Sequence, residues 1–442
     1  MKHVGSGTRE RVCVIGLGYI GLPTAAMLAT TCVDVVGVDV NDGVIAKLEN
    51  GELHAEEAGL DSLVKAARDS DRLQLSGTPV PADAFILCVP TPATPEHAAD
   101  LSFVEAAARS ILGVLRPGNL VILESTVPPT TTEHLLVPIL EESGLTVERD
   151  GHGTTDGLLV VHCPERVIPG SVIRELKENA RVIGGMSHNA CEVAGQLYRR
   201  FVAGEIFFCD ATTAEVVKLA ENTFRDVNIA LANELAGICE RVGTDAWNVI
   251  RLANHHPRVS LHRPGPGVGG HCISIDPWFL VQSAPDRARL IRTARHVNAD
   301  QPKLVVQQAL EMVEDVAGRP SVVVLGLAYK GGVDDTRESP AIEVVHGLRD
   351  AGCDVRIVDP LVTAGFDGAA SVEDGFAEAD LAVLVADHGE FRELDPQVLG
   401  ELMRGKRLLD TRCFLDHRRW SEAGFSIQVL GGGHTTVDAQ PL

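Results

Sequence analysis

A single cysteine, Cys272, stands at the end of a loop that is crowded with glycine and proline. Four glycines and two prolines lie among the seven residues 264–270, so this run cannot form the interior of a helix or strand. Helix-like sequence follows, with Asp276 four residues after the cysteine. A thiolate is stabilised near a helix N-terminus and is then a nucleophile. The alternative is a tight structural turn that leads into a buried cysteine.

Other residues that could do chemistry follow apolar runs typical of buried strands. The predicted strands are residues 84–89, 120–123 and 158–161. Glu124, Thr126 and Glu165 come after the second and third of them. Ligands of open α/β sheets bind beyond the carboxyl ends of the strands, so these side chains stand where a reaction would take place. For each of them alone, the alternative is a helix cap or a turn.

A long helix is predicted over residues 214–242, which contain no proline and no glycine before Gly237. At ~1.5 Å per residue it spans roughly 43 Å, enough to connect two domains. Lys218 and Asn222 lie four residues apart on it and therefore share one face. The residues around Lys218 are mostly apolar, which favours a lysine that points into a pocket over a solvated one.

The N-terminal region carries a dinucleotide fingerprint. A predicted strand at 11–16 leads into the sequence GLGYIG, then a helical run, then a second strand that ends at Asp39. Glycines at 16, 18 and 21 permit the turn and the close approach of a pyrophosphate to a helix N-terminus. Asp39 would accept hydrogen bonds from a ribose diol and repel a 2′-phosphate, so NAD is favoured over NADP. The alternative is a glycine turn between packed elements.

A second region of the same plan begins near Ser321. It has a strand at 321–326, a helix predicted to begin at Pro340 after the N-cap Ser339, and a strand at 354–358. Its loop lacks GxGxxG but carries Lys330 and Arg337. These cations suit a phosphate ligand, and the alternative is a charged loop exposed to solvent.

The predicted fold class is α/β, with two Rossmann-like doubly wound domains joined by a helical domain that contains a long central helix. A chain of 442 residues is expected to form two or three domains, and only 4% aromatic residues predict an aliphatic core. The expected domains are residues 8–210 for NAD, 211–305 for the helical domain and 318–430 for the second Rossmann-like domain.

Composition excludes several classes of function. The net charge of −22 argues against nucleic acid or an acidic membrane surface as partner. No apolar run reaches the ~18 residues of a membrane helix, and residues 1–7 show no signal peptide, so a cytoplasmic protein is expected. Ten cysteines contain no CxxC pair, so neither a metal site nor a disulfide scaffold is expected.

Taken in order, these motifs resemble the UDP-glucose/GDP-mannose dehydrogenase family over nearly the whole chain. The motifs are GLGYIGLP (16–23), VPTP (89–92), EST (124–126), CPERV (163–167), RVIGG (181–185), GVGGHC (267–272) and DDTRESPA (334–341). Within the family the chain is most similar to members that act on UDP-N-acetyl-D-mannosamine. The segments RLANHHPRV (251–259) and DPWF (276–279) carry that likeness.

The resemblance implies a four-electron oxidation of a sugar C6 alcohol to a carboxylate, with two NAD per sugar. Cys272 would trap the aldehyde as a thiohemiacetal, and loss of a second hydride would leave a thioester for water to cleave. Lys218 would stabilise the oxyanion, and Asn222 and Thr126 would position oxygens or water. Asp276 and Glu165 are the candidates for proton handling and hydrolysis, and the division between them stays open.

The resemblance also implies the binding residues and the partner. The implied cofactor contacts are Gly16, Gly18, Tyr19, Ile20, Gly21, Asp39, Thr91 and Thr126. The implied substrate contacts are Glu165, Arg166, Val167, Lys218, Asn222, Arg258, Gly269, Lys330 and Arg337. Arg258 resembles an arginine that reaches the substrate of a neighbouring subunit, so a homodimer is expected. The acid sugar would enter polysaccharide biosynthesis.

Three positions depart from the family pattern, and four alternative functions stay open. Thr126 is followed by VPPT in place of a Pro-x-Gly turn, Ser274 stands where Pro or Ala is usual, and Tyr329 replaces a commoner Phe. The alternatives are a UDP-N-acetylglucosamine 6-dehydrogenase, a UDP-glucose 6-dehydrogenase, an NAD-sensing binding protein and an acyl-thioester transferase. His271, with no Lys-Asp pair after the loop, disfavours UDP-glucose.

Overall fold

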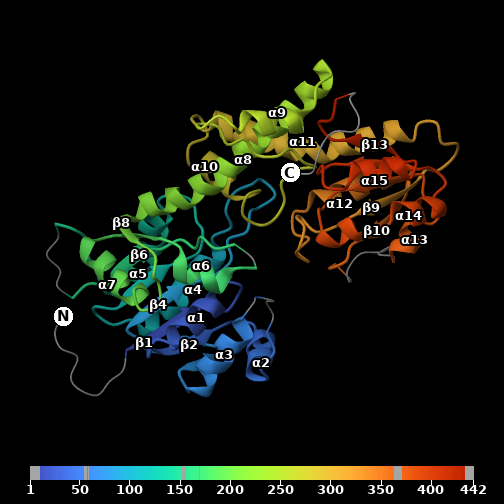
Figure 1. The fold of residues 1–442 in the computed structure, drawn as a ribbon. Coiled ribbons are helices and arrows are strands. Elements are labelled where there is room, and N and C mark those ends of the chain that lie inside the picture. The colour runs from blue at the N-terminus through green and yellow to red at the C-terminus, as the bar shows by residue number, and fades with distance from the viewer. Residues whose placement is uncertain are drawn as a thin grey trace. The chain divides into compact units, whose positions relative to one another are not determined.

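The computed structural model describes residues 10–53, 57, 59–151, 156–168, 170–362 and 371–433. Residues 8 and 9 of the predicted first domain lie outside these ranges. The chain divides into two compact units (Figure 1). The first runs to Glu221 and includes Gln282–Ala284, and the second comprises Asn222–Val281 and the chain from Pro285 onward.

The first unit is built on an eight-stranded sheet with the order β3-β2-β1-β4-β5-β6-β7-β8. The strands are β1 (Arg11–Ile15), β2 (Asp34–Val38), β3 (Leu73–Ser76), β4 (Ala84–Leu87), β5 (Leu120–Leu123), β6 (Leu159–His162), β7 (Arg181–Gly185) and β8 (Ile206–Asp210). Among the described strands of this sheet, only β6 and β7 pair in antiparallel fashion. The strand order reverses between β1 and β4, which marks the edge where dinucleotides bind in such sheets.

Helices cover both faces of this sheet. The helices are α1 (Gly21–Ala29), α2 (Asp42–Glu49), α3 (Leu60–Asp69), α4 (Ser102–Ile111), α5 (Val137–Glu141), α6 (Val172–Glu178) and α7 (His188–Tyr198), with the short turns η1 (Leu112–Val114) and η2 (Thr132–Leu136). Val12 and Val14 of β1 pack in one core with α1, α3 and α7. Cys13 and Ile15 pack in a second core with α4 and α5. Alternate residues of a strand point to opposite faces, so these apolar strands are buried on both sides.

The second unit combines long helices with a five-stranded parallel sheet of order β10-β9-β11-β12-β13. The helices of its first part are α8 (Ala211–Val242, which begins in the first unit), α9 (Ala246–Ala253), α10 (Asp276–Ser283) and α11 (Arg289–Met312). The strands are β9 (Ser321–Leu325), β10 (Asp354–Val358), β11 (Leu381–Leu384), β12 (Arg407–Asp410) and β13 (Ser426–Val429). The remaining elements are α12 (Pro340–Asp350), α13 (Val372–Phe376), η3 (Gly389–Glu393), α14 (Pro396–Leu402) and α15 (His417–Glu422). Within the described ranges, no helix is both long and apolar enough to cross a membrane.

The turn after β9 repeats the turn after β1. In the first unit the Asp39 carboxylate accepts the Leu17 N–H at 2.9 Å, and in the second the Asp359 carboxylate accepts the Leu327 N–H at 2.6 Å. Asp359 also contacts the buried ring of His388 at 3.1 Å and its side chain is 1% exposed, whereas Asp39 is half-buried. The predicted fold class, with two Rossmann-like sheets and a long helix, is therefore confirmed, and only the first turn keeps its acid open to a ligand.

β6 begins and ends one residue later than predicted, which changes the place of His162. The residue lies just beyond the predicted strand 158–161, but it belongs to β6, pairs with Gly184 of β7 and is fully buried. Burial lowers the pKa of His162 to about 3, against a smaller opposing effect of the Leu123 backbone. The imidazole is therefore neutral in the folded protein near pH 7.

His162 makes the fold sensitive to acid. The unfolded chain binds a proton at this residue near pH 6.5 and the folded chain does so only near pH 3, so stability is full above 6.5 and falls as the pH drops through this window. At pH 5 the loss is about 2 kcal/mol. Urea titrations at pH 7.5 and at pH 5 give the free energy of unfolding of each protein. Between these two pH values, the His162→Leu variant is expected to lose about 2 kcal/mol less than the wild type. An equal change in both proteins would contradict this role.

Candidate active site

Glycines shape the turn between β1 and α1. A Cβ on Gly21 would fall well inside van der Waals contact with the Gly16 oxygen, and one on Gly16 would lie 2.5 Å from the Cys88 oxygen. A Cβ on Gly18, in contrast, would meet nothing within 4 Å. No side chain caps the N-terminus of α1, so the positive end of its dipole is available to an anion, whereas the Leu22 N–H already donates to the Gly18 carbonyl at 3.2 Å. This turn fits the pyrophosphate of NAD.

The acid predicted to hold the ribose is fixed by the backbone. Asp39 directly follows β2, and its two oxygens accept the N–H groups of Leu17 and Asn41, each at 2.9 Å. The two amide donors set the orientation of the carboxylate. The remaining lone pairs of a half-buried carboxylate suit a diol donor.

The other predicted cofactor residues lie around the same edge of the sheet. The Tyr19 hydroxyl donates to the Glu57 carboxylate, and Ile20 directly precedes α1. The Thr91 hydroxyl donates to the Thr126 carbonyl at 2.6 Å, which ties the segment after β4 to the segment after β5. These contacts hold the strand ends in place.

Glu165 lies in the segment after β6, where the charge of Lys218 of α8 acts on its carboxyl group. Burial raises the pKa of the Glu165 carboxyl, and Lys218 opposes that rise. Lys218 is itself buried, at 7% exposure, and so points away from bulk water, as predicted from its apolar surroundings. The Val167 N–H donates to Glu165, which orients the carboxylate. Arg166 turns to α8 instead, where its guanidinium holds Glu221.

Cys272 lies one turn ahead of α10. Its carbonyl accepts the N–H groups of Ile275 and Asp276, the latter at 2.8 Å. Asp276 opens α10, and its carboxylate accepts the Asn222 amide at 2.6 Å. Asn222 in turn accepts a hydrogen bond from Arg225 at 2.7 Å. The buried Asn222–Asp276 bond therefore links α8 to the turn that carries the cysteine.

The glycines of the cysteine loop allow close packing. A Cβ on Gly269 would collide with the Glu338 oxygen, and one on Gly270, whose φ is +82°, would lie 3.0 Å from the Tyr329 ring. The Gly270 N–H also donates to the Arg337 carbonyl at 3.1 Å. The loop is thus seated on the segment that follows β9. Glycines in this loop could serve loop motion or the close approach of its backbone to neighbouring residues. The contacts with Glu338 and Tyr329 favour close approach.

Cations gather near this loop. Arg337 binds Asp335 through Nε at 2.9 Å and Nη2 at 2.6 Å. The Asp335 hydrogen bond is the main cause that raises the pKa of Arg337, with a smaller contribution from the charge of Cys272. The Lys330 ammonium lies 5.8 Å from the centre of the Tyr329 ring. Each cation retains donors that an anionic ligand can use.

Three positions that pack against the proposed site residues were not predicted. Half-buried Arg412 follows β12, where a Cβ on Gly265 would lie 2.6 Å from its guanidinium and its Nε donates to the Val385 carbonyl at 3.0 Å. Arg225 had a signal, since it stands three positions after Asn222 on the same helix. Glu215 of α8 accepts the Thr132 N–H at 2.7 Å and so fixes the unusual loop after Thr126. Ser274, another departure from the pattern, donates to the Gly270 carbonyl.

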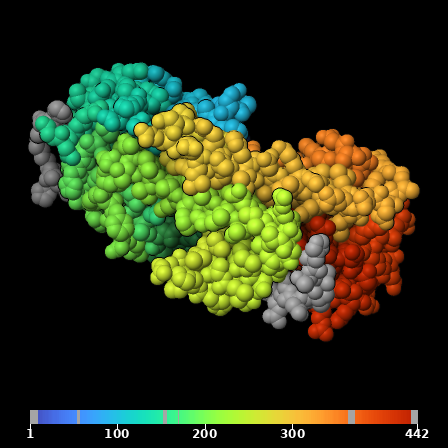
Figure 2. Space-filling view, turned by 90° about the horizontal axis from the view of Figure 1, so that it is seen from above, coloured from blue at the N-terminus to red at the C-terminus, as the bar shows by residue number. Residues whose placement is uncertain are grey.

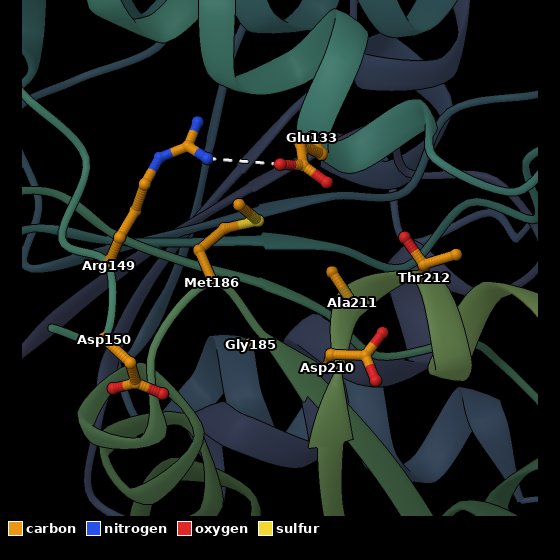
Figure 3. A pocket seen from close by; sticks show the side chains of 8 residues that line it. All are labelled: Glu133, Arg149, Asp150, Gly185, Met186, Asp210, Ala211 and Thr212. Carbon is orange, nitrogen blue, oxygen red and sulfur yellow. Dashed lines mark hydrogen bonds and ion pairs between the residues drawn. The ribbon is translucent and has the colours of Figure 1, made fainter.

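The cavity in Figure 3 contains no predicted site residue. It has a volume of about 330 Å³ and lies in the first unit, where Arg149 and Glu133 form an ion pair at 3.2 Å. Asp150 and Asp210 also line it, and Asp210 is engaged with Thr213 at the start of α8. Arg258, a predicted substrate contact, is exposed in the segment after α9. Across the described residues, no group of three or more His, Cys, Asp or Glu side chains could hold a metal ion.

The fold and these residues define a class of protein. A dinucleotide sheet with an open glycine turn, a helix that bears buried Lys218 and Asn222, and a cysteine on a packed loop are the parts of an NAD-dependent dehydrogenase. Models of the UDP-glucose/GDP-mannose dehydrogenase family match the NAD binding domain at residues 10–202, the central domain at 212–300 and the UDP binding domain at 323–417. The chain belongs to this family and is an NAD-dependent UDP-sugar dehydrogenase.

Relatives of known name match almost the whole chain. The UDP-N-acetyl-D-mannosamine dehydrogenase of Methanocaldococcus jannaschii is 44% identical over 97% of this chain and 98% of its own. An NDP-N-acetyl-D-galactosaminuronic acid dehydrogenase of Ralstonia nicotianae is 45% identical over 92% and 97%. A solved UDP-D-ManNAc dehydrogenase from Pyrococcus horikoshii has a TM-score of 0.89 and 42% identity, covering 96% of this chain and all of that one.

Proposed function

We propose that this protein oxidises UDP-N-acetyl-D-mannosamine at C6 to UDP-N-acetyl-D-mannosaminuronate, with two NAD per sugar. Relatives named for this substrate support the choice, since they match the chain at 42–44% identity over nearly its full length. The structural observation that carries the reaction type is Cys272 on a packed loop, tied through Asp276 to Asn222 of α8. A hydride acceptor alone would stop at the aldehyde, whereas a nucleophilic thiol opens the route to the acid.

The protein's own groups act in a defined order. NAD, when bound, supplies hydride acceptance in both oxidations. In the first, the Lys218 ammonium stabilises the alkoxide that forms when the C6 hydroxyl loses its proton. The Cys272 thiolate then attacks the aldehyde carbon, which forms a C–S bond and a thiohemiacetal. Loss of the remaining C6 hydrogen as hydride, and of the hydroxyl proton, leaves a thioester on Cys272.

Hydrolysis is assigned to Glu165. Its carboxylate accepts a proton from water as the water oxygen bonds to the thioester carbon, the C–S bond breaks and the Cys272 thiolate leaves. The raised pKa of Glu165 supports this role, because a base whose pKa lies closer to the working pH is more effective. Asp276 is committed to its bond with Asn222 and is proposed to position that amide. Thr126 and Asn222 would orient water and the C6 oxygen.

The remaining binding residues are assigned by the three expected domains, at residues 8–210, 211–305 and 318–430. The first is proposed to hold NAD through Gly16, Gly18, Gly21 and Asp39. In the third, Lys330 and Arg337 are proposed to bind the UDP phosphates, which suit a guanidinium fork and an ammonium. Arg166, Val167 and Gly269 would contact the sugar through their backbone, since the Arg166 side chain is engaged by Glu221.

A homodimer is proposed from an apolar stripe on α8. Phe224, Leu231, Ile238 and Val242 are exposed by 59%, 42%, 56% and 68%, and their spacing of seven, seven and four residues places them along one side of the helix. Figure 2 shows the yellow-green part of the chain, with the later part of α8, open on a broad face. A second copy would bury this stripe, and exposed Arg258 would then be free to reach the partner's substrate.

The role of the stripe in dimer formation can be tested by introducing charged side chains into it. Leu231→Asp with Ile238→Asp is expected to convert a dimer to a monomer, because two buried carboxylates would face an apolar surface. Light scattering after gel filtration gives the mass. Val398→Asp, at an equally exposed valine of α14, is the matched control and should stay dimeric. A wild-type chain that is monomeric at micromolar concentration, or a double variant that stays dimeric, would contradict the stripe's role.

The substrate is tested by initial rates of NADH formation with four UDP-sugars at equal concentration. UDP-N-acetylmannosamine is expected to give the highest kcat/KM. UDP-N-acetylglucosamine is the alternative that the sequence of the cysteine loop leaves open, and UDP-N-acetylgalactosamine is the alternative suggested by the name of the Ralstonia relative. UDP-glucose is the alternative that the loop sequence disfavours. A clear preference for one of these three would keep the reaction and overturn the substrate. No NADH with any of them would favour an NAD-binding protein without this activity.

A further inference from the structure

A buried cluster of charged and polar groups stands beside Glu165 and has no part in the proposed reaction. Its centre is Glu124, the residue after β5, which is 2% exposed. The Glu124 carboxylate accepts hydrogen bonds from the Tyr198 hydroxyl at 2.5 Å and the Cys88 thiol at 3.0 Å. Arg181 Nη1 lies 3.5 Å from the same carboxylate. Glu124 stands at the catalytic edge of the sheet, but its oxygens are occupied by donors of the protein.

The antiparallel pairing of β6 and β7 brings Arg181 to the segment that carries Glu165. His162 pairs with Gly184, so the residues after β6 run back alongside the start of β7. Arg181 opens β7, and its guanidinium lies 3.9 Å from the Cys163 sulfur and 4.8 Å from the centre of the Tyr198 ring. Cys163 is two residues before Glu165. The only antiparallel pair of the described sheet therefore places a buried cation next to the proposed base.

Three charged side chains, each from a different element, act on Glu165. Lys218 comes from α8, Arg181 from β7 and Glu124 from the end of β5. Burial is the main cause that raises the pKa of Glu165; Lys218 and then Arg181 lower it, and Glu124 raises it by a smaller amount. The neighbouring Arg166 is already paired with Glu221. Glu124 and Arg181 thus have opposite effects on one carboxyl group while they neutralise each other.

We propose that the Glu124–Arg181 pair sets the charge state of Glu165, so that Glu124 is a positioning residue for thioester hydrolysis. The inference rests on the hydrolytic role of Glu165 proposed above. Arg181 alone would hold Glu165 as a weakly basic carboxylate. The Glu124 charge offsets part of that field and leaves Glu165 a stronger base for water. A purely structural ion pair would fix the packing of β5, β7 and α7 without any effect on the pH dependence of turnover.

Two variants with opposite expected effects test the pair. Glu124→Gln removes the negative charge and keeps the shape, so the acid limb of the kcat–pH profile is expected to move to lower pH. Glu124→Gln with Arg181→Gln removes both charges, and because the effect of Arg181 on Glu165 is the larger, the limb should move to higher pH. Tyr198→Phe keeps both charges and removes one hydrogen bond, so its limb should stay in place.

The outcomes separate this inference from the function on which it rests. Glu165→Gln is expected to remove the acid limb and to slow turnover; a limb that persists there means that Glu165 is not the base. If Glu165→Gln removes the limb, but the limb stays unmoved in both charge variants, the role of the pair is wrong and that of Glu165 stands. Should Glu124→Gln fail to fold with an unpaired buried Arg181, the double variant carries the test, since removal of both buried charges is better tolerated.

Discussion

Cys272→Ala is expected to lower kcat by at least about 10³-fold and to leave NAD binding unchanged. The thiol is the group to which the acyl intermediate is assigned, and its removal blocks the second oxidation and the hydrolysis together. NADH absorbance gives turnover and titration calorimetry gives NAD affinity. The loop should persist, because the hydrogen bonds that hold it do not involve the thiol. The Gly270 N–H donates to the Arg337 carbonyl, and the Asp276 N–H donates to the Cys272 carbonyl.

The matched control for Cys272 is Cys32→Ala. Cys32 is exposed and lies at the end of α1, outside the proposed site, so this variant should keep wild-type turnover. A Cys272→Ala protein that retains more than about a tenth of wild-type kcat would exclude the thioester route. Loss of NAD affinity in the same variant would instead show that the substitution disturbs more than the nucleophile.

The second large effect is expected at two glycines of one turn, with different outcomes. Gly18→Ala adds a Cβ to open space, so folding is expected to be unchanged, while the methyl occupies the approach of the pyrophosphate and raises the Kd for NAD about 100-fold. Gly21→Ala would place its Cβ against the Gly16 oxygen, so the β1–α1 turn itself is expected to fail. Thermal unfolding and NAD calorimetry on both variants separate the two effects.

UDP binding supplies the internal control for the glycine pair. It belongs to the C-terminal family domain, at residues 323–417, and should be the same in Gly18→Ala as in the wild type. Wild-type affinity of Gly18→Ala for NAD would show that the pyrophosphate does not pass this glycine. A stable Gly21→Ala protein would show that the turn relaxes at low cost.

Local signals predicted the first β–α–β unit and the start of α12. The glycine fingerprint with its flanking strands, and Ser339 before Pro340, are features of a few adjacent residues, and Ser339 does cap α12 by accepting the Ala341 N–H. β7 and β8 were not predicted as strands. Their place at the far edge of the sheet, and the antiparallel β6–β7 pair, depend on a pairing between distant segments that no local pattern records.

The site was predictable where one helix or one loop carries it, and less so where side-chain direction decides. Lys218 is buried as its apolar neighbours indicated, and Asn222 shares its helix. Glu124 and Glu165 looked alike in sequence, since both follow strands. Only the structure shows that Glu124 faces Arg181 and Tyr198. Arg412 gave no signal at all, because its position against the cysteine loop brings together segments about 140 residues apart in the chain.

The most direct test of the account is the number of NADH formed for each UDP-N-acetylmannosamine consumed, read from absorbance at complete conversion. Two NADH per sugar, with the uronate as product, is the predicted result, because the proposed thioester on Cys272 requires both oxidations before water can release the acid. One NADH per sugar, with an aldehyde as product, would contradict the account and remove Cys272 from its role.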